Sequence, residues 1–163
     1  MNRRHARHAL TAAVLVCVPW GLVACTSSSP EDDRDPSADT PACELFRPVA
    51  VDLGLGDPSA SSISPHGCTA YEEEYGTFTL TLDDRPLAAA AAGAGRRTEM
   101  EINGREAVML MGAMDGVCKI FLPVDERSSV ELRLGRTTAM TPQVCTSLEE
   151  AAEKVAARLA ARD

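Results

Sequence analysis

The sequence predicts a single α+β domain over residues 43–163, with an antiparallel sheet of about five strands, a short N-terminal helix and a C-terminal amphipathic helix. Three observations support this fold class. Apolar and polar residues alternate in 77–82 and again in 130–134, as in half-buried strands. Asn103-Gly104 is the dipeptide that best suits a two-residue hairpin turn. Toward the C-terminus, apolar residues recur every three or four positions, as in an amphipathic helix.

Residues 1–24 have the features of an export signal. A basic start, Asn2 to Arg7, precedes an apolar run, Ala9 to Trp20, that is too short to span a membrane. Leu22-Val23-Ala24-Cys25 then matches the bacterial lipobox, in which the cysteine thiol is diacylated and the signal removed. The alternatives are an ordinary cleaved signal with a free Cys25 and a twin-arginine signal, although the residues after Arg3-Arg4 match that motif poorly.

The lipidated cysteine is predicted to be followed by a disordered tether, so that residues 25–42 form the anchor and spacer. Residues 26–41 are rich in serine, proline and acidic residues and have no apolar side chain larger than alanine, so they cannot bury enough surface to offset the entropy of an ordered chain. A flexible coil of this length reaches roughly 20–24 Å. The folded domain is therefore expected to begin near Cys43.

The first half of the domain is predicted to contain one helix and one strand. Helix-compatible residues run from Cys43 to Val51 and stop before Gly54. The Gly, Pro and Ser content of residues 56–67 indicates a loop. In the strand over 77–82, one face carries Phe78, Leu80 and Leu82 while the other carries threonines.

The second half is predicted to be a short helix, a meander of strands and a final helix. Asp83 or Asp84 is suited to cap a helix over Leu87 to Ala92. Strands 98–102 and 105–111 follow, joined by the Asn103-Gly104 turn, and a second turn at Asp115-Gly116 leads to strand 117–122. In the last strand, Val130, Leu132 and Leu134 point inward. The final helix is predicted from a Ser147-x-x-Glu150 capping box and from an apolar stripe of Leu148, Ala152, Val155 and Leu159.

The cysteines predict two disulfide bonds. Cys17 leaves with the signal and Cys25 takes the lipid, so an even number remains in an oxidising compartment. Three pairings of the remaining four are possible. We favour Cys43–Cys145 with Cys68–Cys118, because the first joins the two helices and the second joins strand regions; Cys43–Cys68 with Cys118–Cys145 also fits the sequence.

The whole pattern resembles a family. After the lipobox and tether come Cys43-Glu44-Leu45, Leu53-Gly54, Gly67-Cys68, a strand cysteine at 118, and Cys145 before an Ala/Leu helix. This layout resembles small actinobacterial cell-envelope lipoproteins that are grouped as a domain of unknown function. The presence of only two lysines among many arginines and alanines fits a GC-rich genome. The resemblance implies no catalytic residues. By analogy alone, it suggests a relation to the PsbP/Mog1-type α/β/α sandwich.

Neither catalysis nor nucleic-acid binding is expected. His66 is the one histidine after the signal and lies in a Ser/Pro loop, and no nucleophile-elbow, metalloprotease or phosphate-loop motif occurs. The net charge of −8 argues against a phosphate-binding footprint. We therefore expect a protein that is not an enzyme and has no cofactor.

Two groups of side chains offer metal-ligand chemistry, and both have a simpler interpretation. Glu72-Glu73-Glu74 supplies carboxylates, but successive strand residues point to opposite faces, so solvated charge explains them. Met109, Met111 and Met114, with Met100 across the hairpin, would bring thioethers together for copper(I). Packing of methionine in the core of the sheet is the simpler interpretation, and full burial of Met109 and Met111 among aliphatic side chains would exclude copper(I) binding.

The expected function is a monomeric, non-enzymatic interaction module, anchored by Cys25 at the extracytoplasmic face of the cell membrane. The alternative is a carrier or sensor domain for a small ligand or copper(I). A large closed apolar cavity would favour a ligand carrier. An exposed apolar patch or a free sheet edge would favour a protein partner.

Overall fold

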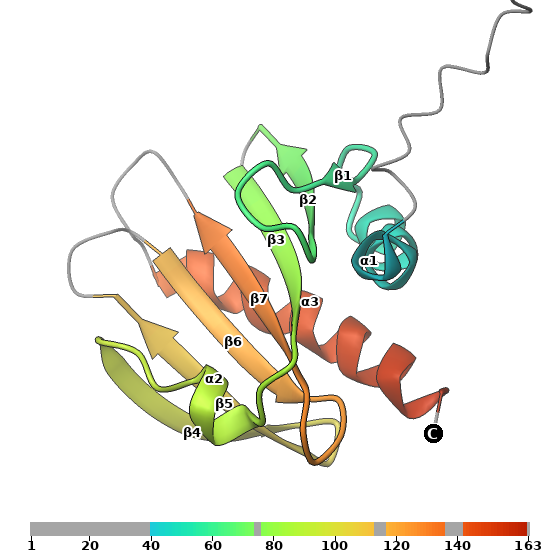
Figure 1. Ribbon diagram of the computed structural model, residues 1–163. Helices are drawn as coiled ribbons and strands as arrows, with labels where there is room; N and C mark the ends of the chain where they lie inside the picture. Colours follow the sequence, from blue (N-terminus) through green and yellow to red (C-terminus); the bar gives the residue numbers. More distant parts are fainter. Residues whose placement is uncertain (1–39, 74–75, 113–116, 136–141, 163) are drawn as a thin grey trace, which may run out of the picture. The chain divides into compact units, whose positions relative to one another are not determined.

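The computed structural model describes residues 40–73, 76–112, 117–135 and 142–162, and these form an α+β fold. A seven-stranded antiparallel sheet has the order β1-β2-β3-β7-β6-β5-β4, with helices on it (Figure 1). The elements in chain order are α1 (Pro41–Asp52), β1 (Ser59–Ala60), β2 (Gly67–Glu72), β3 (Gly76–Asp83), α2 (Leu87–Ala90), β4 (Arg96–Ile102), β5 (Arg105–Met111), β6 (Val117–Pro123), β7 (Ser129–Gly135) and α3 (Pro142–Ala160).

The first helix begins two residues earlier than Cys43. The Thr40 hydroxyl accepts a hydrogen bond from the Cys43 backbone N–H at 3.3 Å, and a proline occupies the first turn, where its missing N–H costs nothing. The helix ends in a Schellman motif: the Leu55 N–H donates to the Ala50 carbonyl at 2.9 Å, and Gly54 has a φ of 68°. Both ends of α1 are therefore specified by local sequence.

The predicted strands are all present, but the sheet has two more and a different order. The unpredicted strands, β1 and β2, continue the sheet beyond β3 in antiparallel pairing. Of the five predicted strands, only β4 to β7 form the expected meander, because β3 pairs with β7 rather than with β4, the next strand in sequence. This pairing places Leu80 beside Leu132, which lies 52 positions later in the sequence. A local sequence pattern cannot predict a contact between residues so far apart in the chain.

The predicted hairpin is confirmed. Asn103 and Gly104 have φ angles of 51° and 78°, and Ile102 pairs with Arg105 directly across the turn. These positive φ angles are those that a type I′ turn requires. The Asn103 side-chain amide also donates to the Glu153 carbonyl of α3 at 2.8 Å, so the turn is fixed to the helix.

We expect Asn103→Val to destabilise the domain by about 2 kcal/mol, because a β-branched residue is strained at positive φ and the amide bond to α3 is lost. Denaturant unfolding measures this loss. Asn103→Gly is the control, since it accepts the turn geometry and loses only the amide, at a cost of about 1 kcal/mol. Equal stability of the Asn103→Val variant and the unsubstituted protein would contradict this account of the turn.

The main core lies between the sheet and the two longer helices. α1 contacts β2 and β3, while α3 contacts β6 and β7, and both lie on the same face. The predicted helix stripe is confirmed, since all four of its members are buried there. A smaller apolar cluster on the opposite face joins α2 to β5 and β6; its members are Leu87, Ala90, Ala91, Val108, Leu110 and Phe121.

Two predicted helix caps are wrong. The short helix α2 begins at Leu87 as predicted, but it is a single turn with Pro86 at its N-cap and no side-chain capping bond, because Asp83 bonds Arg85 instead of the helix amides. The last helix begins at Pro142, so the Ser147-x-x-Glu150 box lies inside α3. Proline is favoured at the first position of a helix, so Pro142 is itself a signal for the start of α3. Cys145, which precedes Ser147, is already helical and is joined to the sheet by its disulfide bond to Cys118.

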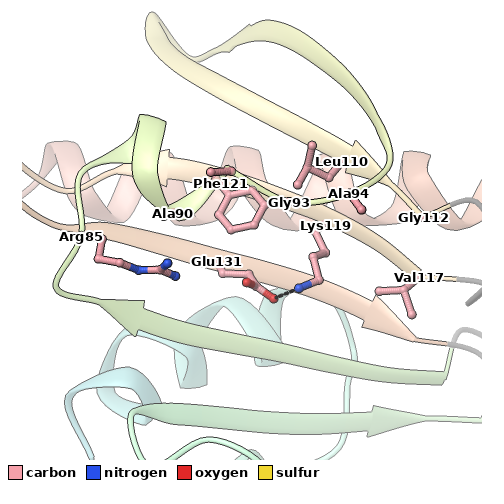
Figure 2. A pocket seen from close by; sticks show the side chains of 11 residues that line it. Arg85, Ala90, Gly93, Ala94, Leu110, Gly112, Val117, Lys119, Phe121 and Glu131 are labelled. Carbon is pink, nitrogen blue, oxygen red and sulfur yellow. Dashed lines mark ion pairs between the residues drawn. The ribbon is translucent and has the colours of Figure 1, made fainter.

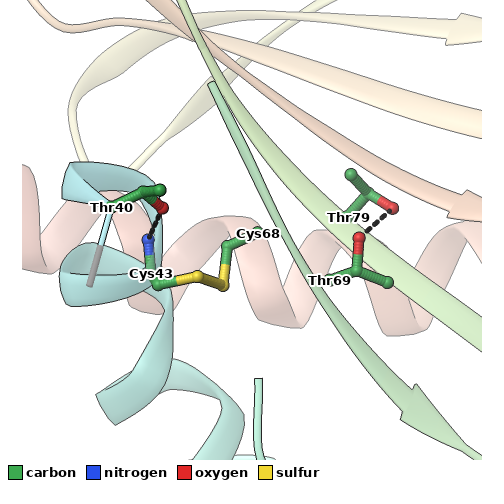
Figure 3. The surroundings of a disulfide bond; sticks show 5 residues. All are labelled: Thr40, Cys43, Cys68, Thr69 and Thr79. Carbon is green, nitrogen blue, oxygen red and sulfur yellow. Dashed lines mark hydrogen bonds between the residues drawn. A yellow bond between two sulfur atoms is a disulfide. The ribbon is translucent and has the colours of Figure 1, made fainter. Parts of the chain in front are cut away.

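Two disulfides are present as predicted, but the favoured pairing is wrong. The structure has Cys43–Cys68, which joins α1 to β2 (Figure 3), and Cys118–Cys145, which joins β6 to α3. Their Cα–Cα distances are 5.0 and 5.6 Å, within bridging range. Cys68 and Cys118 lie on β2 and β6, which β3 and β7 separate, so about 14 Å of sheet excludes the favoured bridge. Each bridge instead fastens one helix to the strand beneath it.

Candidate functional site

The candidate site is the face of the sheet that α1 and α3 leave uncovered, here called the open face. Register places Thr69, Thr79, Arg133 and Lys119 side by side across β2, β3, β7 and β6 on this face. Residues in this row point away from α1 and α3, since the alternate positions of each strand fill the main core. Among the described helices, only the short helix α2 covers part of the open face, where it packs on β5 and β6 and reaches β7.

A cavity of about 360 Å³ lies on the open face beside α2 (Figure 2). Its floor contains Leu110, Val117 and Phe121, and its wall is the Ala90–Ala94 segment. The cavity is open rather than closed, and its far side carries charged groups. It is therefore not the large closed apolar cavity that would favour a ligand carrier.

Three charged side chains stand in a row at this cavity. The Lys119 ammonium lies 2.9 Å from a Glu131 carboxylate oxygen, with exposed side-chain fractions of 34% and 22%. Figure 2 shows Glu131 between Lys119 and Arg85, and the Glu131 charge contributes to raising the pKa of Arg85. The half-buried Lys119–Glu131 pair and the exposed Arg85 guanidinium can together hold a ligand or partner that has both charges.

Arg85 is fixed by Asp83, just before α2. The Arg85 Nε donates to an Asp83 carboxylate oxygen at 2.8 Å, and its backbone N–H donates to the same oxygen at 3.0 Å. These hydrogen bonds hold the pKa of Asp83 below its usual value and raise the pKa of the Arg85 guanidinium. The Ser129 hydroxyl donates to the Arg85 carbonyl at 2.9 Å, so the segment entering α2 is bound to β7.

Arg133 extends the charged row toward β3. It is the register partner of Lys119 on one side and of Thr79 on the other. The Arg133 side chain makes no hydrogen bond or ion pair with another described residue, although it is half-buried. Its five guanidinium donors are therefore available to an acceptor outside the described residues.

The β1–β3 end of the open face is a shallow hydroxyl-lined groove of about 380 Å³. The hydroxyl oxygens of Thr69 and Thr79 lie 3.4 Å apart across β2 and β3 (Figure 3). Ile63 lines the groove and is 70% exposed, and Tyr71, register partner of Thr77 on the same face, is 62% exposed. Exposed tyrosine and isoleucine beside hydroxyl groups are typical of protein-binding surfaces.

A further hollow, near the β6–β7 turn, has a structural explanation. Asp125 accepts hydrogen bonds from the backbone N–H groups of Arg127 and Ser128 at 2.7 and 2.8 Å. The Arg127 backbone bond is the main cause that lowers the pKa of Asp125. The Asp125 carboxylate therefore stabilises the turn between β6 and β7, which is a structural role.

Those methionines considered for copper(I) that the structure describes lie on the core side of the sheet. Met109 is buried in the main core and Met111 packs against that core, as expected for gap-filling side chains. The Arg96 guanidinium donates to the Met111 sulfur at 3.1 Å, and its positive charge opposes a copper cation there. Met114 lies outside the described residues.

The other side chains considered for catalysis or metal binding do not form a cluster in the described part of the chain. His66 is exposed, and its carbonyl accepts a bond from the Leu82 N–H at 3.0 Å. Glu72 is the last residue of β2, Glu73 follows it in a turn, and Glu74 lies outside the described residues. Within the described ranges, no three His, Cys, Asp or Glu side chains are placed to hold a metal ion.

The anchor cysteine, Cys25, lies outside the described residues. No helix in the described ranges is long and apolar enough to cross a membrane. The four domain cysteines are all accounted for by the two disulfides.

Sequence reasoning did not identify the open face as a site. One signal was present: Lys119 interrupts an otherwise apolar run from Val117 to Leu122. A strand with apolar residues on both of its faces is buried on both faces. A single lysine in such a strand therefore indicates that one face is no longer covered at that position. Arg133 and Tyr71 lack such a signal, because charged and aromatic residues are ordinary on a half-exposed strand.

Comparison with known proteins finds no matching family model, no matching curated protein and no matching solved structure. The assignment of the open face as a candidate site therefore rests on the geometry of the described residues alone.

Proposed function

We propose that this protein is a lipid-anchored module of the cell envelope, held at the extracytoplasmic face of the cell membrane through Cys25, and that its domain binds a partner protein without catalysing a reaction. The observation that carries the proposal is the open face. One side of the sheet holds the main core and both disulfide-bound helices. The other side presents half-buried charges and an exposed tyrosine.

The chemistry of the open face supports partner binding over catalysis. The Lys119–Glu131 pair gives charge of both signs but no nucleophile with an adjacent base. Arg133 adds unused donors, and Tyr71 offers a rigid amphipathic contact at low entropic cost. Disulfides on both helices support an oxidising compartment, which agrees with the predicted export.

Site-specific photo-crosslinking in the intact, lipidated protein tests this proposal. A photoreactive phenylalanine replaces Tyr71 in one variant and Arg133 in another, and Ala157, exposed on α3, is the control position. We expect an adduct of the same discrete mass from both open-face positions and none from position 157. No adduct at either open-face position, or equal labelling at all three, would contradict binding through the open face.

The cavity beside α2 favours a second candidate, binding of a small ligand with an apolar body and charged groups. Its volume of about 360 Å³ is at the lower end of the range for ligand pockets. Native mass spectrometry of the exported protein would then show the added mass of a bound ligand. The Ala94→Leu variant, whose larger side chain occupies part of the cavity, would lack this added mass. A bare mass would leave the partner protein as the one candidate.

A further inference from the structure

The last strand of the sheet, β4, has a free edge. Among the described strands it pairs only with β5, and five of its seven residues are exposed. Every second residue of an edge strand directs its N–H and C=O groups outward, ready to pair with another strand. The question is which strand this edge fits.

The charges of β4 are divided between its two halves. Arg96 and Arg97 occupy the first half, while Glu99 and Glu101 occupy the second. Edges that keep other chains away carry one sign, often lysine, so that a second copy is repelled. A strand with a basic half and an acidic half is instead complementary to itself when a second copy runs antiparallel.

The charges also select one register. With Thr98 on the two-fold axis, Arg97 of each copy lies opposite Glu99 of the other, and Arg96 lies opposite Met100. A register centred on Glu99 places two copies of Glu99 opposite each other, and one centred on Met100 places Glu99 opposite Glu101. The register at Thr98 thus makes two attractive pairs and brings no like charges directly opposite.

We propose that two copies of this protein associate through antiparallel pairing of their β4 strands, with Thr98 on the two-fold axis. This closes the free edge of both sheets in one symmetric interface. Glu99 is 75% exposed, and its contact with Arg97 of the same chain, at 3.5 Å, is long. Arg97 also donates to the Ala91 carbonyl at 3.3 Å, which leaves further guanidinium donors for Glu99 of the second copy.

A charge-swap mixture tests the proposal on the full mature chain. The Arg97→Glu chain carries acids at both positions and the Glu99→Arg chain carries bases at both, so neither fits itself but each fits the other. Sedimentation equilibrium should show self-association roughly tenfold weaker or more in each separate variant. Association should return when the two are mixed. Arg162→Glu, at the exposed end of α3, is the charge-matched control and should self-associate like the unsubstituted protein.

A cysteine cross-link tests the register independently. Thr98→Cys places two thiols directly opposite on the axis, at a cross-strand Cα separation of about 4.5–5.5 Å that a disulfide accepts. We expect a covalent dimer on a non-reducing gel for Thr98→Cys and none for Ala157→Cys. A monomer at every concentration of the unsubstituted protein, or a mixture no more associated than its separate components, would overturn the proposal.

Discussion

Replacing Cys25 by serine should move the protein from the membrane fraction to the soluble fraction. Two acyl chains, at roughly 0.8 kcal/mol per buried methylene, anchor a protein stably, and the described helices offer no spanning alternative. The chain is acidic, with a net charge of −8, so it has no general attraction to an anionic lipid surface that could replace the acyl chains. Fractionation of cells followed by immunoblotting measures the change.

The control for this prediction is Cys17→Ser. Cys17 lies within the apolar run of the signal, where serine is a small perturbation, and this variant should remain in the membrane fraction. Mass spectrometry of the mature N-terminal peptide should show diacylated Cys25 in the control. Membrane retention of Cys25→Ser would rule out the lipid as the anchor.

Removing either disulfide should destabilise the domain by about 3.5 kcal/mol, because the cross-links close loops with sequence separations of 25 and 27 residues. For a domain of this size such a loss lowers Tm by roughly 10 °C or more. Each pair is replaced together, as Cys43→Ala with Cys68→Ala or as Cys118→Ala with Cys145→Ala, so that no unpaired thiol remains. Calorimetry in the absence of reductant measures the change.

The two pairs should have similar effects because their loops are almost equally long. Each also removes a covalent tie between a helix and the sheet, α1 to β2 in one case and α3 to β6 in the other. Cross-pair variants, such as Cys43→Ala with Cys118→Ala, are the matched control; they leave two unpaired thiols and should be as unstable as a variant lacking both bridges. A Tm unchanged by loss of either pair would contradict this role of the disulfides.

Local sequence determined the secondary structure where a short segment holds its own signal. Asn103-Gly104 fixed its hairpin because few residue pairs accept two positive φ angles. The stripe that includes Leu148 and Val155 defined the buried side of the last helix, since helical periodicity depends on one segment alone. The even number of domain cysteines gave the presence of two bridges.

The open face required the tertiary structure. Alternation in β7 indicates that Arg133 lies opposite the core, but only the pairing of β7 with both β3 and β6 brings it between Thr79 and Lys119. The Lys119 interruption was the one local trace of this face. The single helical turn α2 covers β5 and β6 and reaches β7, and no pattern in the sequence predicts how far across the sheet this helix extends.

The sequence by itself determined the fold class, the helix and hairpin patterns and the presence of two bridges, because each depends on neighbouring residues or on a count. The tertiary structure decided the strand order, the pairing of the cysteines and the free edge at β4. The physical reason is that β-sheet contacts join residues far apart in the chain, as Leu80 and Leu132 show. The alternation of apolar and polar residues along a strand predicts which face of the sheet a residue occupies. Only the tertiary structure shows which strand lies beside it.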